Sequence, residues 1–298
     1  MRSTPPASGA VRQTLLLSVD FEDWHQLVRR RIGTPEWEIA GPALARQMDA
    51  LLRLLDELSA SATFFILGMA ARAHPQLVAK IAARGHEIGC HGDCHRPVHS
   101  QSRGEFAADL RSARETIERL TGRSPVGYRA PAFSITREAQ WAFEVLAEQG
   151  FLYDSSQHDS PRIRHRPTPA TVAPHLLPLG GGRKLWEFPV AVWRTAHARV
   201  PVGGASYWAV LPRRLVLHGL REAGSLAGLY LHPHELDPQP LDADLPRNAA
   251  ISQRLHGALR AAQRNTARRA AAGTLRAIAG SFELIPYGEA HARLAART

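Results

Sequence analysis

The sequence predicts an α/β fold in which parallel strands close into a barrel. Short apolar runs alternate with segments of helical periodicity along most of the 298 residues, and this alternation implies right-handed crossovers and a parallel sheet. Six or seven such units in one chain favour a barrel over an open sheet. Polar residues gather where the strands end, which is where parallel barrels build their sites. We therefore expect a loose tail at residues 1–13, then a single barrel domain over residues 14–298 with a C-terminal helical segment.

The predicted strands are short apolar runs that end in polar residues. The first run, residues 14–20, reads TLLLSVD. Its acidic end is typical of a buried strand that opens onto a site. The other predicted strands are residues 62–68, 86–91, 126–129, 151–154, 185–192 and 226–232.

The predicted helices carry apolar residues at spacings of three and four. In the first helix these residues are Leu44, Met48, Leu51, Leu52, Leu55 and Leu58. Residues 75–83 form the second, with Pro75 at its start and Gly85 after its end. The others cover residues 104–120, 137–149, 212–223 and 248–279, the last as one or two helices. Residues 156–182 are rich in Pro, His and Gly and predict an extended loop.

The formal net charge of +10 invites a nucleic-acid interpretation. The densest basic run, Arg254 to Arg276, has no interleaved aromatic residues, so it predicts a solvated helix face that can meet an anionic surface rather than a nucleic-acid site. No stretch reaches the roughly 20 apolar residues of a membrane span, and the N-terminus lacks the pattern of a signal peptide. We therefore expect a cytoplasmic protein.

Chemistry is carried by residues at the ends of several strands. His91 and His95 can aim their rings at one point, and imidazole suits zinc and similar ions. With 15 histidines in the chain this spacing also arises by chance, but an acidic segment at residues 20–23 can supply an oxygen ligand. A divalent ion in an open site of this kind lowers the pKa of bound water toward about 7 and polarises a carbonyl, as amide hydrolysis requires.

Acid and base candidates lie at the same strand ends. Asp20 is the candidate base and His232 the candidate acid for the departing amine; the alternatives are a helix cap and a loop histidine. Arg129 can pair with Asp20 and orient it, or lie on the surface. Asp154 can hydrogen-bond His232, or close a turn with the two serines that follow it.

Together these motifs resemble the polysaccharide deacetylases of the NodB-homology group, carbohydrate esterase family 4. The resemblance runs from about Leu15 to about Pro238. It rests on five motifs in the family's order: VDFEDW, HGDCH, YRAPAF, YDSS and LYLHPHE. The segment ATFFILG is similar to the family's second strand. More narrowly, VDFEDW, GYRAPAFSI, YDSS, EFPV and LHPHE resemble the subgroup often found with exosortase and exopolysaccharide gene clusters.

The resemblance implies a deformed (β/α)7 barrel and removal of acetyl groups from N-acetylated sugars of a polysaccharide or its precursor. Water bound to a divalent metal, with zinc as the expected ion, would attack the amide carbonyl. It also implies Asp20 as base, His91 and His95 as metal ligands, Arg129 as the orienting residue and His232 as acid.

The sequence departs from the family's pattern at three positions. Asp20 is followed by Phe21 instead of a second aspartate, so the acidic ligand shifts to Glu22 or Asp23. Side chains alternate along a strand, which favours Glu22 if the strand continues, whereas a turn after Phe21 favours Asp23. Gly92 replaces the usual Ser or Thr. His234 stands where the subgroup often has Trp, and it can alter the pocket wall or offer another proton donor.

Three other functions compete with this one. The same scaffold can hydrolyse another C–N amide bond, and a non-catalytic carbohydrate-binding relative would keep the barrel but lose ligands or base. The third is nucleic-acid binding, which the distribution of charge disfavours.

Overall fold

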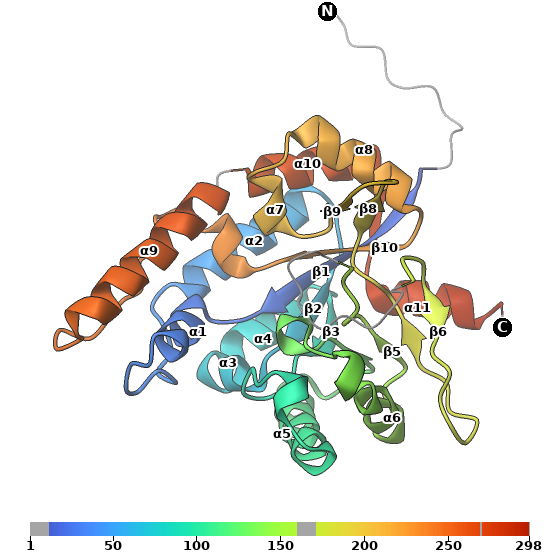
Figure 1. The fold of residues 1–298 in the computed structure, drawn as a ribbon, viewed down its shortest axis with the longest axis horizontal. Coiled ribbons are helices and arrows are strands. Elements are labelled where there is room, and N and C mark those ends of the chain that lie inside the picture. Colours follow the sequence, from blue (N-terminus) through green and yellow to red (C-terminus); the bar gives the residue numbers. More distant parts are fainter. Residues whose placement is uncertain (1–11, 160–170, 269, 298) are drawn as a thin grey trace, which may run out of the picture.

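The strands form a strongly curled sheet surrounded by helices, which confirms the predicted α/β barrel (Figure 1). The computed structural model describes residues 12–159, 171–268 and 270–297. Seven strands run parallel in the order β10-β1-β2-β3-β4-β5-β7. Their bounds are β1 Thr14–Phe21, β2 Thr63–Ile66, β3 Glu87–Cys90, β4 Gly127–Tyr128, β5 Tyr153–Asp154, β7 Trp186–Glu187 and β10 Ala227–Leu231.

The ring of strands closes between β7 and β10 through single bridges instead of a continuous ladder. The N–H of Ala191 donates to the carbonyl of Gly228 at 2.8 Å, and the N–H of Gly228 donates to the carbonyl of Pro189 at 3.1 Å. A Cβ at position 228 would lie 2.9 Å from that Pro189 carbonyl, so glycine permits the close approach. This irregular closure is the deformation of the barrel.

Four further strands lie outside the parallel ring. Strand β6 (His175–Leu176) pairs antiparallel with β7, and β11 (Glu283–Ile285) pairs with the start of β1. Strands β8 (Val192–Arg194) and β9 (Arg199–Pro201) form a separate hairpin.

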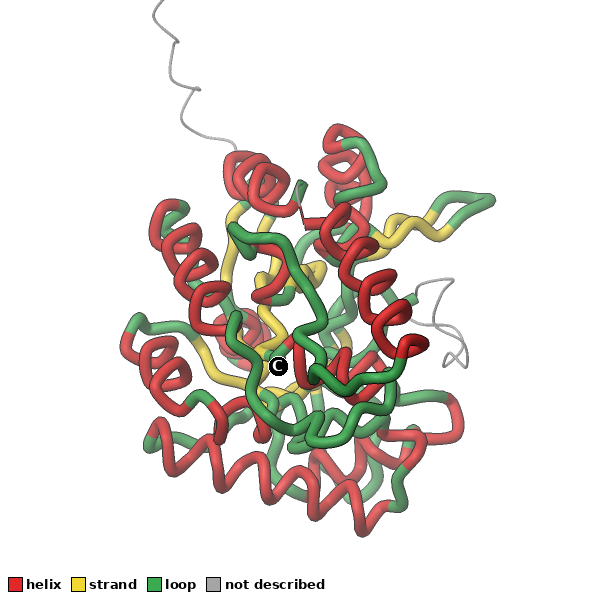
Figure 2. Tube along the Cα trace, turned by 90° about the vertical axis from the view of Figure 1, so that its left-hand side faces the viewer, coloured by secondary structure: helices red, strands yellow, loops and turns green. Residues whose placement is uncertain are grey.

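Helices pack around the strands, as the tube view shows (Figure 2). Local sequence sets several of their ends: α5 begins with a capping box between Ser102 and Glu105 and ends at Gly122, which has φ +70°. The helices are α1 Trp24–Arg31, α2 Leu44–Glu57, α3 Gly68–Ala73, α4 Pro75–Ala83, α5 Arg103–Thr121, α6 Trp141–Glu148, α7 Ala205–Trp208, α8 Arg213–Ala223, α9 Ile251–Arg268, α10 Ala271–Ser281 and α11 Tyr287–Ala295.

Strand β1 shows how the barrel interior is built. Its odd positions, such as Leu17 and Val19, belong to the large apolar core of the protein. The even position Leu16 belongs to a second apolar cluster with Phe65, Tyr153, Phe188, Ile285, Tyr287 and Ala290. Because side chains alternate along a strand, the next even residues, Ser18 and Asp20, lie on the same side as Leu16 and nearer the carboxyl end.

The predicted elements are largely confirmed, with a few corrections. The predicted strand 185–192 is broken, because its residues divide between β7 and β8. Helices α1, α3 and α11 and strand β11 were not expected. Of the predicted tail, residues 1–11 lie outside the described residues. Arg12 and Gln13 are held in place: Arg12 donates to the carbonyl of Phe282, and the carbonyl of Gln13 accepts from the backbone N–H of Glu283.

The predicted loop over residues 156–182 is described in part, because residues 160–170 lie outside the described residues. The part that follows contains β6. Within the described chain, no helix combines the length and apolar composition that crossing a bilayer requires.

Candidate metal and catalytic site

The acidic segment after β1 sends its carboxylates to two different places. The β1 ladder ends at Phe21, but the backbone is still extended at Asp23, so the alternation persists and Glu22 follows Asp20 into the site. Asp23 turns away and caps α1, accepting from the backbone N–H of His25 at 2.9 Å and of Gly41 at 2.7 Å. Of the two acids expected as alternatives, Glu22 joins the histidines and Asp23 does not.

The loop after β3 brings His91 and His95 to the same carboxylate. Gly92 has φ +77°, and a Cβ there would lie 2.8 Å from a carboxylate oxygen of Asp109, so the glycine is required by the turn. His95 has φ +51°, a conformation that costs a non-glycine residue about 1–3 kcal/mol and is characteristic of functional sites. The strained turn therefore serves to aim the second imidazole.

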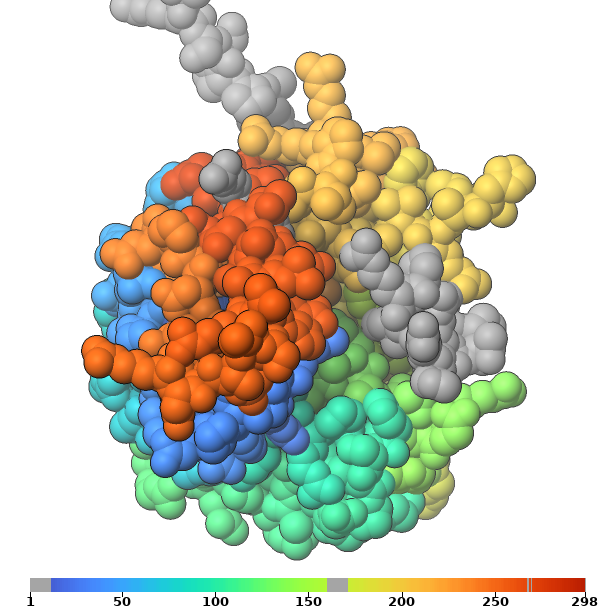
Figure 3. Space-filling model, turned by 60° about the vertical axis from the view of Figure 1, so that its left-hand side comes forward, coloured from blue at the N-terminus to red at the C-terminus, as the bar shows by residue number. Residues whose placement is uncertain are grey.

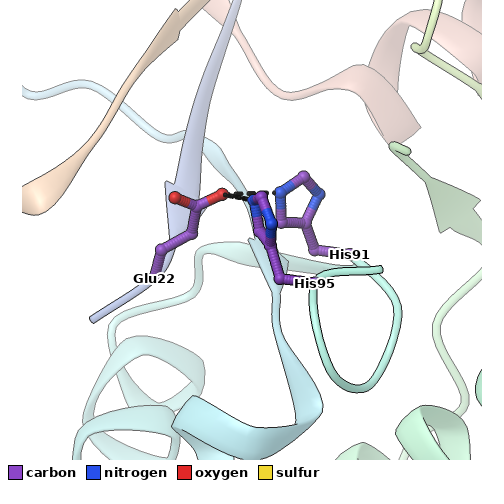
Figure 4. Close-up of side chains that lie close together, drawn as sticks. All are labelled: Glu22, His91 and His95. Atoms are coloured by element: carbon purple, nitrogen blue, oxygen red, sulfur yellow. Dashed lines mark hydrogen bonds and ion pairs between the residues drawn. The ribbon is translucent and has the colours of Figure 1, made fainter. Parts of the chain in front are cut away.

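Three donor atoms converge at this point (Figure 4). The Nε2 atoms of His91 and His95 lie 2.8 Å and 3.0 Å from Oε1 of Glu22. His91 and Glu22 are buried, whereas the side chain of His95 is 20% exposed. Burial opposes the charged form of His91, but Asp20 and Glu22 outweigh it and raise its pKa. Burial likewise opposes ionisation of Glu22, but the histidines hold its pKa well below the usual range.

This donor set fits a divalent metal ion. The Nδ1 of His91 lies 2.8 Å from the carbonyl oxygen of Arg129, which fixes the tautomer and leaves Nε2 directed at the cluster. Two imidazole nitrogens and one carboxylate oxygen within 4.8 Å of one another are a common ligand set for zinc and similar ions, with positions left for water and substrate.

Arg129 lies fully buried beneath this cluster and holds Asp20. Its Nη1 donates to Oδ1 of Asp20 at 2.8 Å and to the hydroxyl of Ser18 at 2.6 Å. Its other nitrogens donate to Ser155 and to the hydroxyl of Tyr287. Burial opposes the charge of Arg129, but Asp20 and then Tyr287 raise its pKa. The predicted pair is therefore present, and a buried guanidinium with all its partners is rigid.

His232 directly follows β10 and faces both acids. Its Nε2 lies 3.9 Å from Oδ2 of Asp20 and 3.9 Å from Oε2 of Glu22. Its Nδ1 lies 3.3 Å from Oε2 of Glu235, which also accepts from the backbone N–H of His232 at 2.8 Å. Burial opposes the imidazolium, but Glu235 and then Glu22 and Asp20 raise the pKa of His232 to about 9.

The carboxylate that orients His232 is thus Glu235, which the sequence reasoning missed. The signal was present as the spacing of three residues in HPHE, because Glu235 closes a capping box on His232 at the start of the turn η4 (Pro233–Leu236). Glu235 is held in turn by the hydroxyl of Ser206 in α7, and Ser206 accepts from Nη1 of Arg264 in α9 at 2.7 Å. Because these residues are far apart in the sequence, no local pattern indicates this chain of contacts.

Asp154 does not reach His232 in this arrangement. Its carboxylate accepts from the backbone N–H of Ser156 at 2.8 Å and from the Ser156 hydroxyl at 2.7 Å, so the turn interpretation is the one the structure supports. Its neighbour across the sheet is Glu187. Burial raises the pKa of both carboxyls, and Asp154 raises that of Glu187 well above its usual range.

His234 forms the wall beside the acid. Its ring stacks on His232 with centroids 5.1 Å apart and packs against Trp24 at 5.3 Å. Burial, followed by the charge of His232, lowers the pKa of His234 to about 3. A neutral ring is a poor proton donor, so of the two roles expected for His234 the structure supports packing beside His232.

Two family models match the chain in sequence. Residues 40–151 match the polysaccharide deacetylase family, and residues 158–270 match a domain of unknown function, DUF3473. His91, His95 and Arg129 fall in the first region and His232 and Glu235 in the second, while Asp20 and Glu22 precede both.

Curated relatives match over part of the chain. A peptidoglycan deacetylase of Helicobacter pylori is 34% identical over 107 residues, which are 36% of this chain and 35% of that protein. A peptidoglycan deacetylase-like protein of Gibberella zeae is 33% identical over 108 residues, or 36% of this chain and 31% of that protein. The match thus spans about a third of each relative.

Solved structures share the fold along the whole chain. A candidate polysaccharide deacetylase from Mycobacterium smegmatis superimposes with a TM-score of 0.62 at 21% identity, covering 100% of this chain and 95% of that one. An allantoinase superimposes with a TM-score of 0.60 at 16% identity, covering 99% and 95%. At these identities the likeness concerns the fold alone.

Proposed function

We propose that this chain is a metal-dependent hydrolase that removes acetyl groups from N-acetylated sugars of a polysaccharide or its precursor. The match of residues 40–151 to the polysaccharide deacetylase family supports this proposal. One observation carries the proposal. The Nε2 atoms of His91 and His95 lie within 3.0 Å of Oε1 of Glu22, and Asp20 and His232 face the same point. The motifs at Asp20, Arg129 and His232 further support the exopolysaccharide-associated subgroup.

Glu22, His91 and His95 would hold the ion, for which we propose zinc. A divalent ion bound there supplies a Lewis acid for the amide carbonyl and lowers the pKa of water. The chain's own groups handle the protons. Asp20 accepts the proton of the attacking water through Oδ2, because Arg129 already occupies Oδ1.

His232 protonates the departing amine. With a pKa raised to about 9 it carries a proton at neutral pH, and Glu235 on Nδ1 leaves Nε2–H directed at the site. Arg129 keeps Asp20 oriented, and His234 limits the space beside the acid. Base and acid therefore approach the scissile bond from strands β1 and β10, which are neighbours in the sheet.

The first experiment measures metal content of the purified protein together with acetate release from N-acetylated hexosamine oligosaccharides. His91→Ala should lose most of the bound metal and nearly all acetate release. His197→Ala, which changes an exposed histidine in the turn between β8 and β9, is the matched control and should change neither. Full metal occupancy and full acetate release in His91→Ala would refute the proposal.

The competing amide hydrolase is tested with the same protein. If the metal-loaded enzyme released no acetate from any N-acetylated sugar but cleaved a cyclic or non-sugar amide, the site would be assigned to that other C–N bond. A protein that bound such sugars without cleaving any amide would be the non-catalytic relative.

A further inference from the structure

Helix α9 exposes an apolar stripe on its outward face. Ile251, Leu255 and Leu259 are 77%, 68% and 68% exposed, and their spacing of four places them on one side of the helix. The opposite side carries small residues that pack on the protein: Ala261 is buried, and a Cβ on Gly257 would lie 2.8 Å from Ala243. The helix lies at one margin of the molecule in Figure 1 and on the face turned toward the viewer in Figure 3.

The same helix carries positive charge and no compensating acid. The sequence contains no Asp or Glu between Asp244 and Glu283. Arg254 and Arg260 lie on the two flanks of the apolar stripe, since a helix advances by about 100° per residue. Arg254 donates to backbone carbonyls of residues 247 and 249 and leaves its charge unpaired.

Arg31, the last residue of α1, lies near the cations of α9. Over the described residues, neither Arg31 nor Arg260 has a recorded hydrogen bond or ion pair. Burial, followed by the charges of Arg260 and Arg264, lowers the pKa of Arg31. Guanidinium groups held together without a carboxylate favour the arrival of an anion.

We propose that the outward face of α9 docks on an anionic phospholipid surface. An apolar stripe flanked by arginines suits the boundary of a bilayer, because the apolar side chains enter between the acyl chains while the guanidinium groups stay at the phosphates. Anionic headgroups supply the countercharge that the protein lacks along this helix. Three apolar residues and a few arginines give reversible attachment.

A second copy of the chain is a poorer occupant of the same face. Two α9 helices paired through their stripes would bring Arg254 and Arg260 toward the partner's arginines, with no acidic residue on either helix to offset the repulsion. The sequence's net charge of +10 adds to that repulsion. An anionic lipid surface accommodates both the apolar stripe and the positive charge of the arginines.

Docking of α9 also bears on the substrate, and this step rests on the proposed function. Helix α9 contacts the turn η4, and Arg264 of α9 reaches His232 through Ser206 and Glu235. Helix α9 therefore lies beside the edge of the barrel that carries the site, with its apolar stripe on the outward side. This placement suits a glycan carried by a membrane lipid better than a freely diffusing sugar.

The test is cosedimentation of the full chain with vesicles. The natural protein should bind phosphatidylglycerol–phosphatidylcholine vesicles and release them at high salt, and it should bind pure phosphatidylcholine far less. The triple variant Ile251→Gln, Leu255→Gln, Leu259→Gln should lose at least about tenfold in vesicle affinity. Val210→Gln, which alters a 70% exposed apolar residue outside α9, is the matched control and should bind normally.

Separate readouts distinguish this inference from the proposed function. The triple variant should keep its metal and its acetate release from soluble oligosaccharides, because none of its changes touches the site. Unchanged vesicle binding by the triple variant, or equal binding to both vesicle types, would overturn the docking proposal. A dimer of the natural protein that becomes a monomer in the triple variant would assign the face to a second copy instead.

Discussion

The two ends of the barrel interior are built from opposite chemistry. At the carboxyl end, three carboxylates face cationic or titratable partners. Asp20 faces Arg129, Glu22 faces His91 and His95, and Glu235 faces His232. At the amino end the residues are apolar or aromatic: Leu16, Phe65, Tyr153, Phe188 and Tyr287. The difference indicates that one end carries the chemistry and the other holds the strands in place.

Arg129 marks the boundary between the two ends. Its guanidinium carbon lies 4.3 Å from the centre of the Phe65 ring and 5.4 Å from that of Tyr287, while Nη1 reaches Asp20. The aromatic end thus supports the charged one, because cation–π contacts and a tyrosine hydroxyl fix the arginine that orients the candidate base.

Removing the candidate proton donor His232 from the carboxyl end tests the comparison most strongly. His232→Gln should lower kcat for acetate release by about 10²- to 10⁴-fold, since a positioned proton donor contributes that much. Metal content and the midpoint of thermal unfolding should stay close to those of the natural protein, because Glu22, His91 and His95 are untouched. A variant with near-normal kcat would show that His232 is not the proton donor.

The corresponding change at the amino end should affect stability instead. Phe188→Ala removes a fully buried ring that packs on Tyr153 and Tyr287, and should lower the free energy of unfolding by about 3–5 kcal/mol. Denaturant titration measures this loss, and kcat of the folded enzyme should remain nearly normal. A large loss of kcat without loss of stability would mean that the amino end contributes to catalysis and not to stability.

The carboxyl end also contains a separate pair of buried carboxyls, and the smallest expected effect concerns this pair. Asp154 and Glu187 face each other, and burial raises both pKa values although the charge of Arg129 acts against the rise. A raised carboxyl pKa gives stability that is present at low pH and is lost as pH rises through the folded-state pKa. Gln at position 187 keeps a donor toward Asp154 without needing a proton.

Glu187→Gln should therefore match the natural protein in acid and become the more stable of the two as pH rises, by about 1 kcal/mol, the order of one buried hydrogen bond. Denaturant titrations from pH 5 to pH 9 provide the measurement. A difference in stability that shrank as pH rose would show that the pair is ionised.

Much of the fold could be predicted because it depends on local patterns. The periodicity over residues 44–58 and the proline at 75 predicted α2 and α4, whose observed bounds differ by at most one residue. The break between β7 and β8 was missed, because a continuous apolar run gives no sign of where a strand leaves the sheet. Helix α11 and β11 were missed because their positions depend on β1, which is far away in the sequence.

The site shows the same division. The motifs identified Asp20, His91, His95, Arg129 and His232, and the geometry brings all five together. Of the two alternatives for Asp154, the structure shows the turn and not the contact with His232, because the carboxylate accepts from Ser156 in its own turn.

The sequence alone determined the alternation of the main strands and helices, the ends at which polar residues gather, and a set of residues suited to amide hydrolysis. These follow from spacing, which the chain carries locally. Only the tertiary structure decided that Glu22 and not Asp23 joins the histidines, that Glu235 orients His232, and that Tyr287 supports Arg129 from 158 residues away. Such choices depend on where a side chain points once distant strands are in register, and no local pattern records that.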